Sequence, residues 1–300
     1  MTSKPAPQSP LSRRSALKSA AAAGVGATWV TADLGRRIDA ADQASGLKGR
    51  IHHSVCRWCY SKIELDALCK ASKEMGIQSI DLLGLDEIPV AQKHGLTCAM
   101  VSGIPGGIGK GLNRRENHDS ILQWFESAAP KVAAAGCVNV ICFSGNRAGM
   151  SNEEGLEHCA VGLKRLLPIA EKHKLVLVME LLNSKVDHAD YMCDHTAWGV
   201  ELCKRTGSDR FKLLYDIYHM QIMEGDVIRT LRASAPYIAH YHTGGVPGRN
   251  EIDESQEIYY PAVMEAIVAT GFKGFVAQEF IPKRPDALAS LRQGVHICDV

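Results

Sequence analysis

Short apolar segments alternate with longer segments of helical spacing from about residue 50 to the end of the chain, and this alternation constrains the fold more than any other feature. The apolar segments are rich in β-branched residues and short enough to be strands. The expected strands cover residues 51–56, 79–83, 97–101, 139–143, 175–181, 211–215, 238–242 and 274–279.

The intervening segments carry apolar residues at the spacing of an amphipathic helix. Expected helices cover residues 63–75, 90–94, 119–135, 153–173, 196–206, 227–235, 261–270 and 285–296. Eight strand–helix units in a segment of this length predict an α/β fold, the closed (β/α)8 TIM barrel. Five of the expected helices are followed by a glycine, where a left-handed residue commonly ends a helix: Gly76, Gly95, Gly136, Gly207 and Gly271.

An open, doubly wound parallel sheet is the main alternative, because it is built from the same units. Such a sheet would have a glycine-rich phosphate turn directly after its first strand, whereas this strand runs into Arg57 and Trp58. The glycine-rich segment 103–110 comes later, contains Pro105 and is followed by the polar stretch 113–117, so it matches neither nucleotide-binding fingerprint. The barrel is therefore favoured.

The first 45 residues have the pattern of a targeting signal and are not expected to be part of the folded domain. A polar, proline-containing start is followed by Arg13 and Arg14 and then by the small-residue run 19–30, an arrangement that resembles a twin-arginine export signal. We interpret residues 1–45 as signal and leader and residues 46–300 as the TIM-barrel domain, and we expect an exported, periplasmic protein. The small-residue run is less apolar than a membrane span requires, so no span is expected.

Composition excludes several classes of protein. The 34 basic and 33 acidic side chains give a net charge of +1, and a protein without a basic surplus is not expected to bind nucleic acid. With 46% hydrophobic and 22% charged residues, the chain has enough apolar material for a folded core. The ten cysteines are interpreted as structural thiols; Cys56 and Cys59 have redox-motif spacing, but no second pair completes a zinc site.

Four polar residues stand at the ends of the fifth to eighth expected strands, and in a TIM barrel the carboxyl ends of the strands form the active site. A carboxylate directly after an apolar run is costly to bury unless it is paired or binds a metal ion. Three carboxylates and one imidazole, with no thiolate, suit Mn²⁺, Mg²⁺ or Co²⁺. Each residue could instead be a helix cap or turn residue, and Asp216 precedes a segment that it could cap. The four are Glu180, Asp216, His242 and Glu279.

The chain resembles the hydroxypyruvate isomerase family of the xylose-isomerase-like TIM-barrel superfamily. The resemblance covers about residues 50–285 and is densest after residue 175. The segments that carry it are 180–187 (ELLNSKVD), 215–226 (YDIYHMQIMEGD), 247–251 (PGRNE), 257–260 (EIYY), 271–274 (GFKG) and 278–282 (QEFIP).

The resemblance implies a metal-dependent aldose–ketose isomerase acting on hydroxypyruvate or a larger α-hydroxycarbonyl compound. It implies that Glu180 and Glu279 are metal ligands and the paired acid–base groups. Asp216 and His242 would complete the metal shell. Two further residues, His219 and Arg249, would face the substrate oxygens.

The chemistry of isomerisation fits these residue types independently of the resemblance. Isomerisation moves a proton between adjacent carbons, which needs a positioned acid–base pair and stabilisation of negative charge on oxygen. Arg249 is suited to bidentate pairing with a substrate carboxylate, and His219 lies on the same helical face as Asp216. Asn183, Lys185 and Asp187 follow the fifth strand and are interpreted as a solvated loop.

Several alternatives stay open. His242 occupies a position that resembles a Gln in bacterial hydroxypyruvate isomerases and a His in ketose 3-epimerases, so an epimerase or another sugar-processing enzyme shares the same expected site. A metal-containing sugar-binding protein without turnover is a further alternative, and a DNA-repair endonuclease is the least favoured. The expected partner is a small α-hydroxycarbonyl compound or sugar, and the oligomeric state, a homo-oligomer included, stays open.

Overall fold

The structure is a computed structural model that describes residues 46–300, so the expected export signal lies outside the described residues. Within them, seven parallel strands form one sheet in the order β2-β1-β7-β6-β5-β4-β3. Their bounds are β1 His52–Cys56, β2 Ser79–Asp81, β3 Asn139–Cys142, β4 Val176–Glu180, β5 Phe211–Asp216, β6 Ile238–Thr243 and β7 Phe275–Gln278.

The third expected strand, residues 97–101, joins the two ends of this sheet without forming a continuous ladder. Isolated parallel bridges connect Thr97 to Ser79 in β2 and Val101 to Val140 in β3. Between them, Ala99 N–H donates to Ser79 Oγ over 2.7 Å, and Ala99 O accepts from the Asn139 amide over 3.0 Å. Side chains therefore satisfy backbone groups that a neighbouring strand would otherwise pair, and the segment closes the barrel through isolated bridges together with these side-chain hydrogen bonds.

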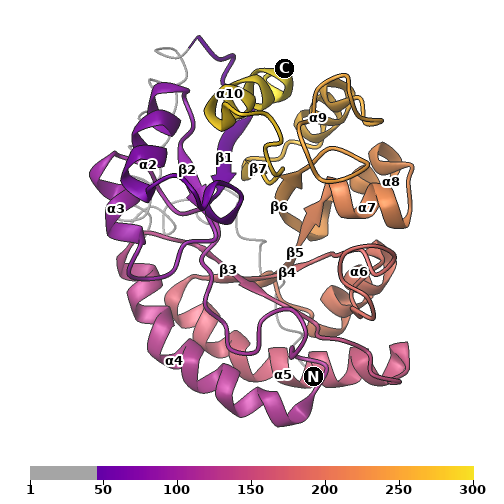
Figure 1. Ribbon diagram of the computed structural model, residues 1–300. Coiled ribbons are helices and arrows are strands. Elements are labelled where there is room, and N and C mark those ends of the chain that lie inside the picture. Colours follow the sequence, from indigo (N-terminus) through magenta and orange to yellow (C-terminus); the bar gives the residue numbers. More distant parts are fainter. Residues whose placement is uncertain (1–45) are drawn as a thin grey trace, which may run out of the picture. The chain divides into compact units, whose positions relative to one another are not determined.

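Helices surround these strands on the outside (Figure 1). The expected helices are present, and the five glycines expected to end helices all have positive φ. One α-helix of the described residues, α7, was not expected from the sequence. The α-helices are α2 Leu65–Glu74, α3 Ile88–Lys93, α4 His118–Ala134, α5 Asn152–His173, α6 Thr196–Thr206, α7 Ile217–Met223, α8 Val227–Ser234, α9 Tyr260–Ala269 and α10 Ala287–Cys298, with 3-10 turns at Arg57–Tyr60, Arg115–Asn117 and Ala235–Tyr237.

The barrel interior is filled by side chains and carries the polar residues at one end. Met100, Ile141, Val178 and Leu214 form a separate buried apolar cluster. Because side chains alternate along a strand, the residue two positions after Val178 or Leu214 faces the same interior. Those residues are Glu180 and Asp216, at the carboxyl ends of β4 and β5.

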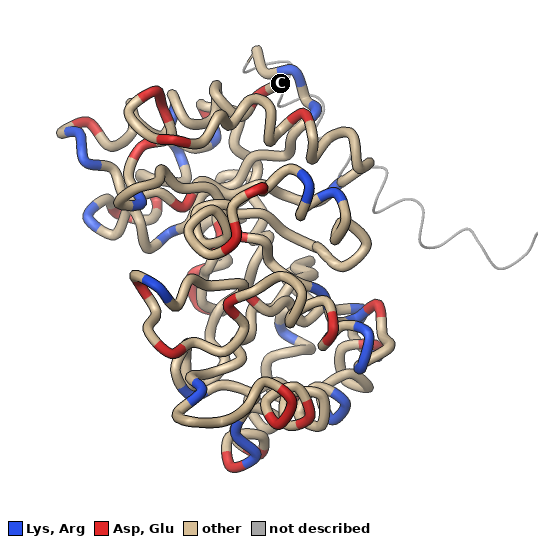
Figure 2. The backbone as a smooth tube through the Cα atoms, turned by 90° about the vertical axis from the view of Figure 1, so that its right-hand side faces the viewer, with Lys and Arg blue, Asp and Glu red and all other residues tan. Residues whose placement is uncertain are grey.

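Basic and acidic side chains are interspersed over the outer helices and loops of the described part (Figure 2). No helix within residues 46–300 has the length and apolar character that a bilayer crossing requires.

Candidate active site

Four side chains from consecutive strands converge at the carboxyl end of the barrel. Glu180, Asp216, His242 and Glu279 each place a potential ligand atom within 4.8 Å of those of the other three. The exposure of none exceeds 4%. The structure thus brings together the four residues that the strand ends predicted.

Asp216 has two functions in this arrangement. Its Oδ1 accepts a hydrogen bond of 3.0 Å from the backbone N–H of His219 and so caps α7, the helix that follows β5 directly. Its Oδ2 is left to face the cluster. The helix-cap interpretation and the site interpretation of Asp216 were posed as alternatives, and the geometry satisfies both, because a carboxylate has two oxygens.

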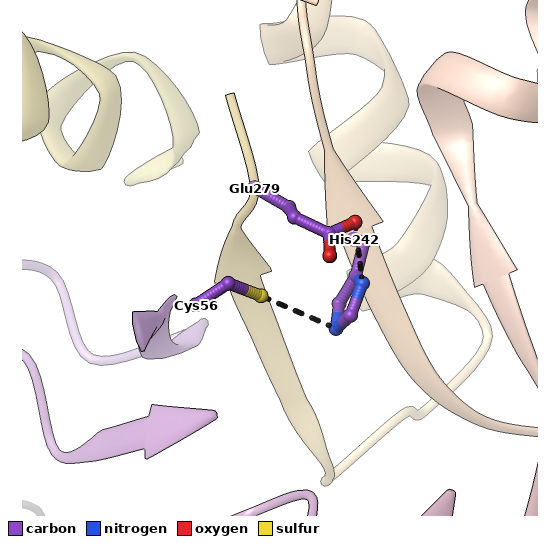
Figure 3. Close-up of side chains that lie close together, drawn as sticks. All are labelled: Cys56, His242 and Glu279. Carbon is purple, nitrogen blue, oxygen red and sulfur yellow. Dashed lines mark hydrogen bonds and ion pairs between the residues drawn. The ribbon is translucent and has the colours of Figure 1, made fainter. Parts of the chain in front are cut away.

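The His242 imidazole lies between two groups of partners (Figure 3). Its Nδ1 is 2.9 Å from Glu279 Oε2 and 3.5 Å from Glu180 Oε1. Its Nε2 points the other way, 3.6 Å from the Cys56 sulfur at the end of β1. Burial raises the pKa of Cys56 well above its usual value, so the group beside His242 is a neutral thiol and not a thiolate.

Arg249 supplies a positive charge to the same cluster. Its Nη2 lies 2.6 Å from Glu279 Oε2 and 3.4 Å from Asp216 Oδ2. The guanidinium carbon lies 5.0 Å from the centre of the Trp58 ring and 5.3 Å from that of Tyr218. Two aromatic faces and two carboxylates therefore fix a cation at the mouth of the barrel.

His219 is fully buried beside Asp216, with its Nε2 3.7 Å from Asp216 Oδ2. Its Nδ1 accepts from the backbone N–H of Asn183 over 3.2 Å. The Asn183 amide and the Tyr218 hydroxyl both donate to Asp187 Oδ2, over 2.6 and 2.8 Å. The solvated-loop interpretation is therefore wrong for Asn183, which is buried and supports the site. Lys185, in contrast, reaches backbone carbonyls at the end of α7.

Sequence reasoning missed several residues of this region. The Trp58 indole N–H donates to Glu279 Oε1 over 2.8 Å. Asp81 and His240 lie beneath the cluster and contact each other over 2.5 Å. Two signals could have found them: Asp81 ends a short strand as the other acids do, and His240 precedes His242 by two positions, which places both on one face of β6.

The two glutamates differ in electrostatic environment. Burial and the negative charge of Glu279 raise the pKa of Glu180. Burial acts in the same direction on Glu279, but the charges of His242 and Arg249 outweigh it and hold that pKa well below its usual value. Neighbouring carboxylates with opposite shifts are typical of acid–base pairs.

The donor set fits a divalent cation. Three carboxylates and an imidazole are hard or borderline ligands, and such ions bind them in preference to thiolates. Within residues 46–300, Glu180 Oε1, His219 Nε2 and Arg249 Nε are buried without a hydrogen-bond partner. Unpaired buried polar atoms at one place are expected where a ligand completes the site.

Residues 88–296 match the sequence pattern of the family described as xylose isomerase-like TIM barrel. The chain belongs to this family. Fold and family thus agree with the expectations drawn from the sequence.

Similarity to individual proteins of the family is low but extensive. The chain is 24% identical to a human protein named putative hydroxypyruvate isomerase over 237 residues, which covers 75% of this chain and 78% of that one. It is 28% identical to the hydroxypyruvate isomerase of Escherichia coli strain K12 over 151 residues, 50% of this chain and 58% of that one. A solved structure titled AP endonuclease, family 2, from Brucella melitensis superposes with a TM-score of 0.72 at 20% identity, covering 82% of this chain and 98% of that chain, a likeness of fold alone.

Proposed function

We propose that this xylose isomerase-like barrel is a metal-dependent aldose–ketose isomerase that interconverts hydroxypyruvate and tartronate semialdehyde. The observation that carries the proposal is the convergence of Glu180, Asp216, His242 and Glu279 on one buried point beside Arg249. Low-identity relatives named hydroxypyruvate isomerase support the choice of reaction.

Glu180, Asp216, His242 and Glu279 would hold a divalent cation, which when bound polarises the substrate carbonyl and stabilises negative charge on its oxygen. The chain's own groups handle the protons. Glu279, whose pKa is lowered, is suited to take the proton from the hydroxyl-bearing carbon. Glu180, whose pKa is raised, is suited to return a proton to the neighbouring carbon. The hydroxyl proton passes to the former carbonyl oxygen, and proton exchange with water returns both glutamates to their starting states.

Arg249 is the group suited to the substrate carboxylate. Its Nε has no protein partner within the described residues, and the fork geometry of a guanidinium matches a carboxylate. Tyr218 and Trp58 hold the guanidinium in place from its faces. His219 presents an unpaired Nε2 to the same space and would contact a substrate oxygen.

Glu180→Gln and Glu279→Gln test the acid–base assignment. Each should lower kcat for hydroxypyruvate isomerisation by about 10²–10⁴-fold, because a proton-transfer group is lost while the side-chain volume is kept. Glu254→Gln, an exposed residue of the 244–258 loop, is the matched control. Full activity in either site variant, with the fold intact by circular dichroism, would refute the roles assigned.

His242 favours one second candidate, a ketose 3-epimerase acting with the same residues. An epimerase removes and returns a proton at a single carbon, whereas an isomerase moves it between two. Incubating the enzyme with candidate substrates in heavy water and locating the deuterium by NMR distinguishes them, because the labelled carbon is the one that is deprotonated.

A further inference from the structure

A second group of buried side chains lies directly beneath the proposed metal ligands. Asp81, at the end of β2, has no exposed surface, and neither do His240 and His242 of β6. Asp81 Oδ2 lies 2.5 Å from His240 Nε2 and 3.3 Å from His242 Nε2. The acid–base chemistry proposed above uses neither Asp81 nor His240.

The two nitrogens of His242 face opposite sides of this layer. Nδ1 faces the carboxylates of Glu279 and Glu180, at 2.9 and 3.5 Å. Nε2 faces Asp81, with the thiol of Cys56 at 3.6 Å. Only the nitrogen without a proton can bind a metal ion, so the position of the His242 proton decides whether Nδ1 is available to it.

Asp81 is itself held in a fixed orientation. Ser54 Oγ of β1 donates to Asp81 Oδ1 over 2.5 Å, and Ser79 Oγ lies 3.5 Å from the same oxygen. The other oxygen, Oδ2, is therefore directed at the two histidines, whose rings stand nearly perpendicular at 84°. Residues from β1, β2 and β6 together fix one carboxylate oxygen beneath His242.

We propose that Asp81 is a positioning residue that accepts the Nε2–H of His242 and thereby keeps the Nδ1 lone pair directed at Glu180, Asp216 and Glu279. Without this acceptor, His242 would place its proton on Nδ1, where Glu279 can accept it, and the lone pair would point away from the metal position. This role rests on the proposed function for its purpose, but it concerns metal binding and is measurable without any substrate.

Asp81→Asn is the main test, because it keeps the shape and removes the charge that selects the Nε2–H form. We expect the Mn²⁺ dissociation constant, measured by calorimetry, to rise about 10–100-fold, the usual effect of losing a residue that orients a metal-binding histidine. Asp194→Asn is the matched control: Asp194 is also buried and contacts His195 over 2.8 Å, but it is not in the cluster. It should leave the Mn²⁺ affinity within about twofold.

Long-range ¹H–¹⁵N correlation spectra of the Zn²⁺-loaded protein show directly which ring nitrogen of His242 carries the proton. The wild type should show His242 protonated at Nε2 and metal-bound through Nδ1, and the Nε2–H signal should shift in Asp81→Asn. Ser54→Ala keeps the Asp81 carboxylate but removes a hydrogen bond that orients it. This variant should also raise the Mn²⁺ dissociation constant, by a smaller factor, and it replaces Asp81→Asn as the test if that variant does not fold.

Three outcomes would overturn the proposal. One is unchanged Mn²⁺ affinity in Asp81→Asn, and another is metal bound through Nε2 in the wild type. The third is two metal ions per chain with one lost in Asp81→Asn, which would make Asp81, His240 and His242 a metal site in their own right. An enzyme that binds Mn²⁺ as predicted but isomerises nothing would refute the proposed function and leave the role of Asp81 standing.

Discussion

At the scale of single residues, the site is a balance of buried charges. Isolated carboxylates are costly to bury, and here three lie in one buried cluster. Arg249 offsets part of this charge through its contacts with Asp216 and Glu279. The His242 imidazole adds a polar partner, with its Nδ1 2.9 Å from Glu279 Oε2. The same charges separate the pKa values of Glu180 and Glu279, so the balance that permits burial also differentiates the acid–base pair.

Trp58 allows a test of how Glu279 is oriented. Trp58→Phe keeps an aromatic face against Arg249 but removes the N–H that donates to Glu279 Oε1. A hydrogen bond to a charged group contributes about 1.5–3 kcal/mol, so kcat should fall by roughly 10- to 100-fold. Trp124→Phe, on α4, is the control and should have no such effect. Equal kcat for wild type and Trp58→Phe would show that this hydrogen bond does not orient Glu279.

At the scale of elements, the loops after the strands hold the site in place. The loop after β6 carries Arg249, whose backbone carbonyl accepts from Ile281 N–H over 2.7 Å. Two residues later in the same loop, Glu251 accepts hydrogen bonds from the backbone N–H groups of Lys283 and Arg284, both at 3.0 Å, and from Ser290 Oγ at 2.8 Å. Glu251 thereby fastens the loop of Arg249 to the segment that follows Glu279.

Stability should depend on pH through Glu251. Burial alone would raise its pKa, but the hydrogen bonds from Arg284, Ser290 and Lys283 outweigh burial and place the pKa below its ordinary value of 4.5. The folded state thus binds this proton less readily than the unfolded state. The stabilisation is complete above about pH 4.5 and is lost as the pH falls through the lowered pKa.

Glu251→Gln should therefore lower the free energy of unfolding by about 1–3 kcal/mol at pH 7 and by less at pH 4, measured by urea titration at both pH values. Glu254→Gln, three residues away and exposed, should change neither value appreciably. A loss in Glu251→Gln that is the same at both pH values would contradict a charge-dependent role.

At the scale of the whole molecule, three proposed ligands lie in β4, β5 and β6 and the fourth, Glu279, directly follows β7. A bound ion would therefore connect four neighbouring parts of the barrel. A ligand that binds only the folded state stabilises it by an amount that grows with its concentration over the dissociation constant, about 2.7 kcal/mol at 100-fold excess. Adding Mn²⁺ to chelator-treated protein should therefore raise Tm by several degrees.

Asp216→Asn is the sharpest control for this shift. An asparagine side chain can still accept from the His219 N–H and cap α7, but it removes a negative charge from the cluster. The variant should keep its fold and lose most of the Mn²⁺-dependent rise in Tm. An undiminished rise would show that the ion binds elsewhere.

Much of the fold followed from local patterns. The period of apolar residues and the helix-ending glycines depend on residues close in sequence, and so the barrel and most element bounds were predictable. Helix α7, which follows Asp216, shows the limit of such local patterns. Most residues of 217–223 are buried because α7 packs within the molecule, so the segment lacks the amphipathic period by which a helix is predicted. The strand expected at residues 97–101 is wrong as a regular strand: the segment lies at the expected place between β2 and β3 but forms only isolated bridges. That side chains of Ser79 and Asn139 replace its ladder bonds was not foreseeable.

The sequence alone determined that acidic and imidazole groups stand at the ends of consecutive strands, because the strand pattern fixes where each strand stops and the barrel brings those ends together. Only the tertiary structure decided what surrounds them. Trp58, Asp81 and Cys56 reach the site from β1, β2 and their loops, far from the ligands in sequence, and their contacts depend on side-chain directions that no local pattern encodes. The ligands follow from chain order, whereas their orientation follows from packing.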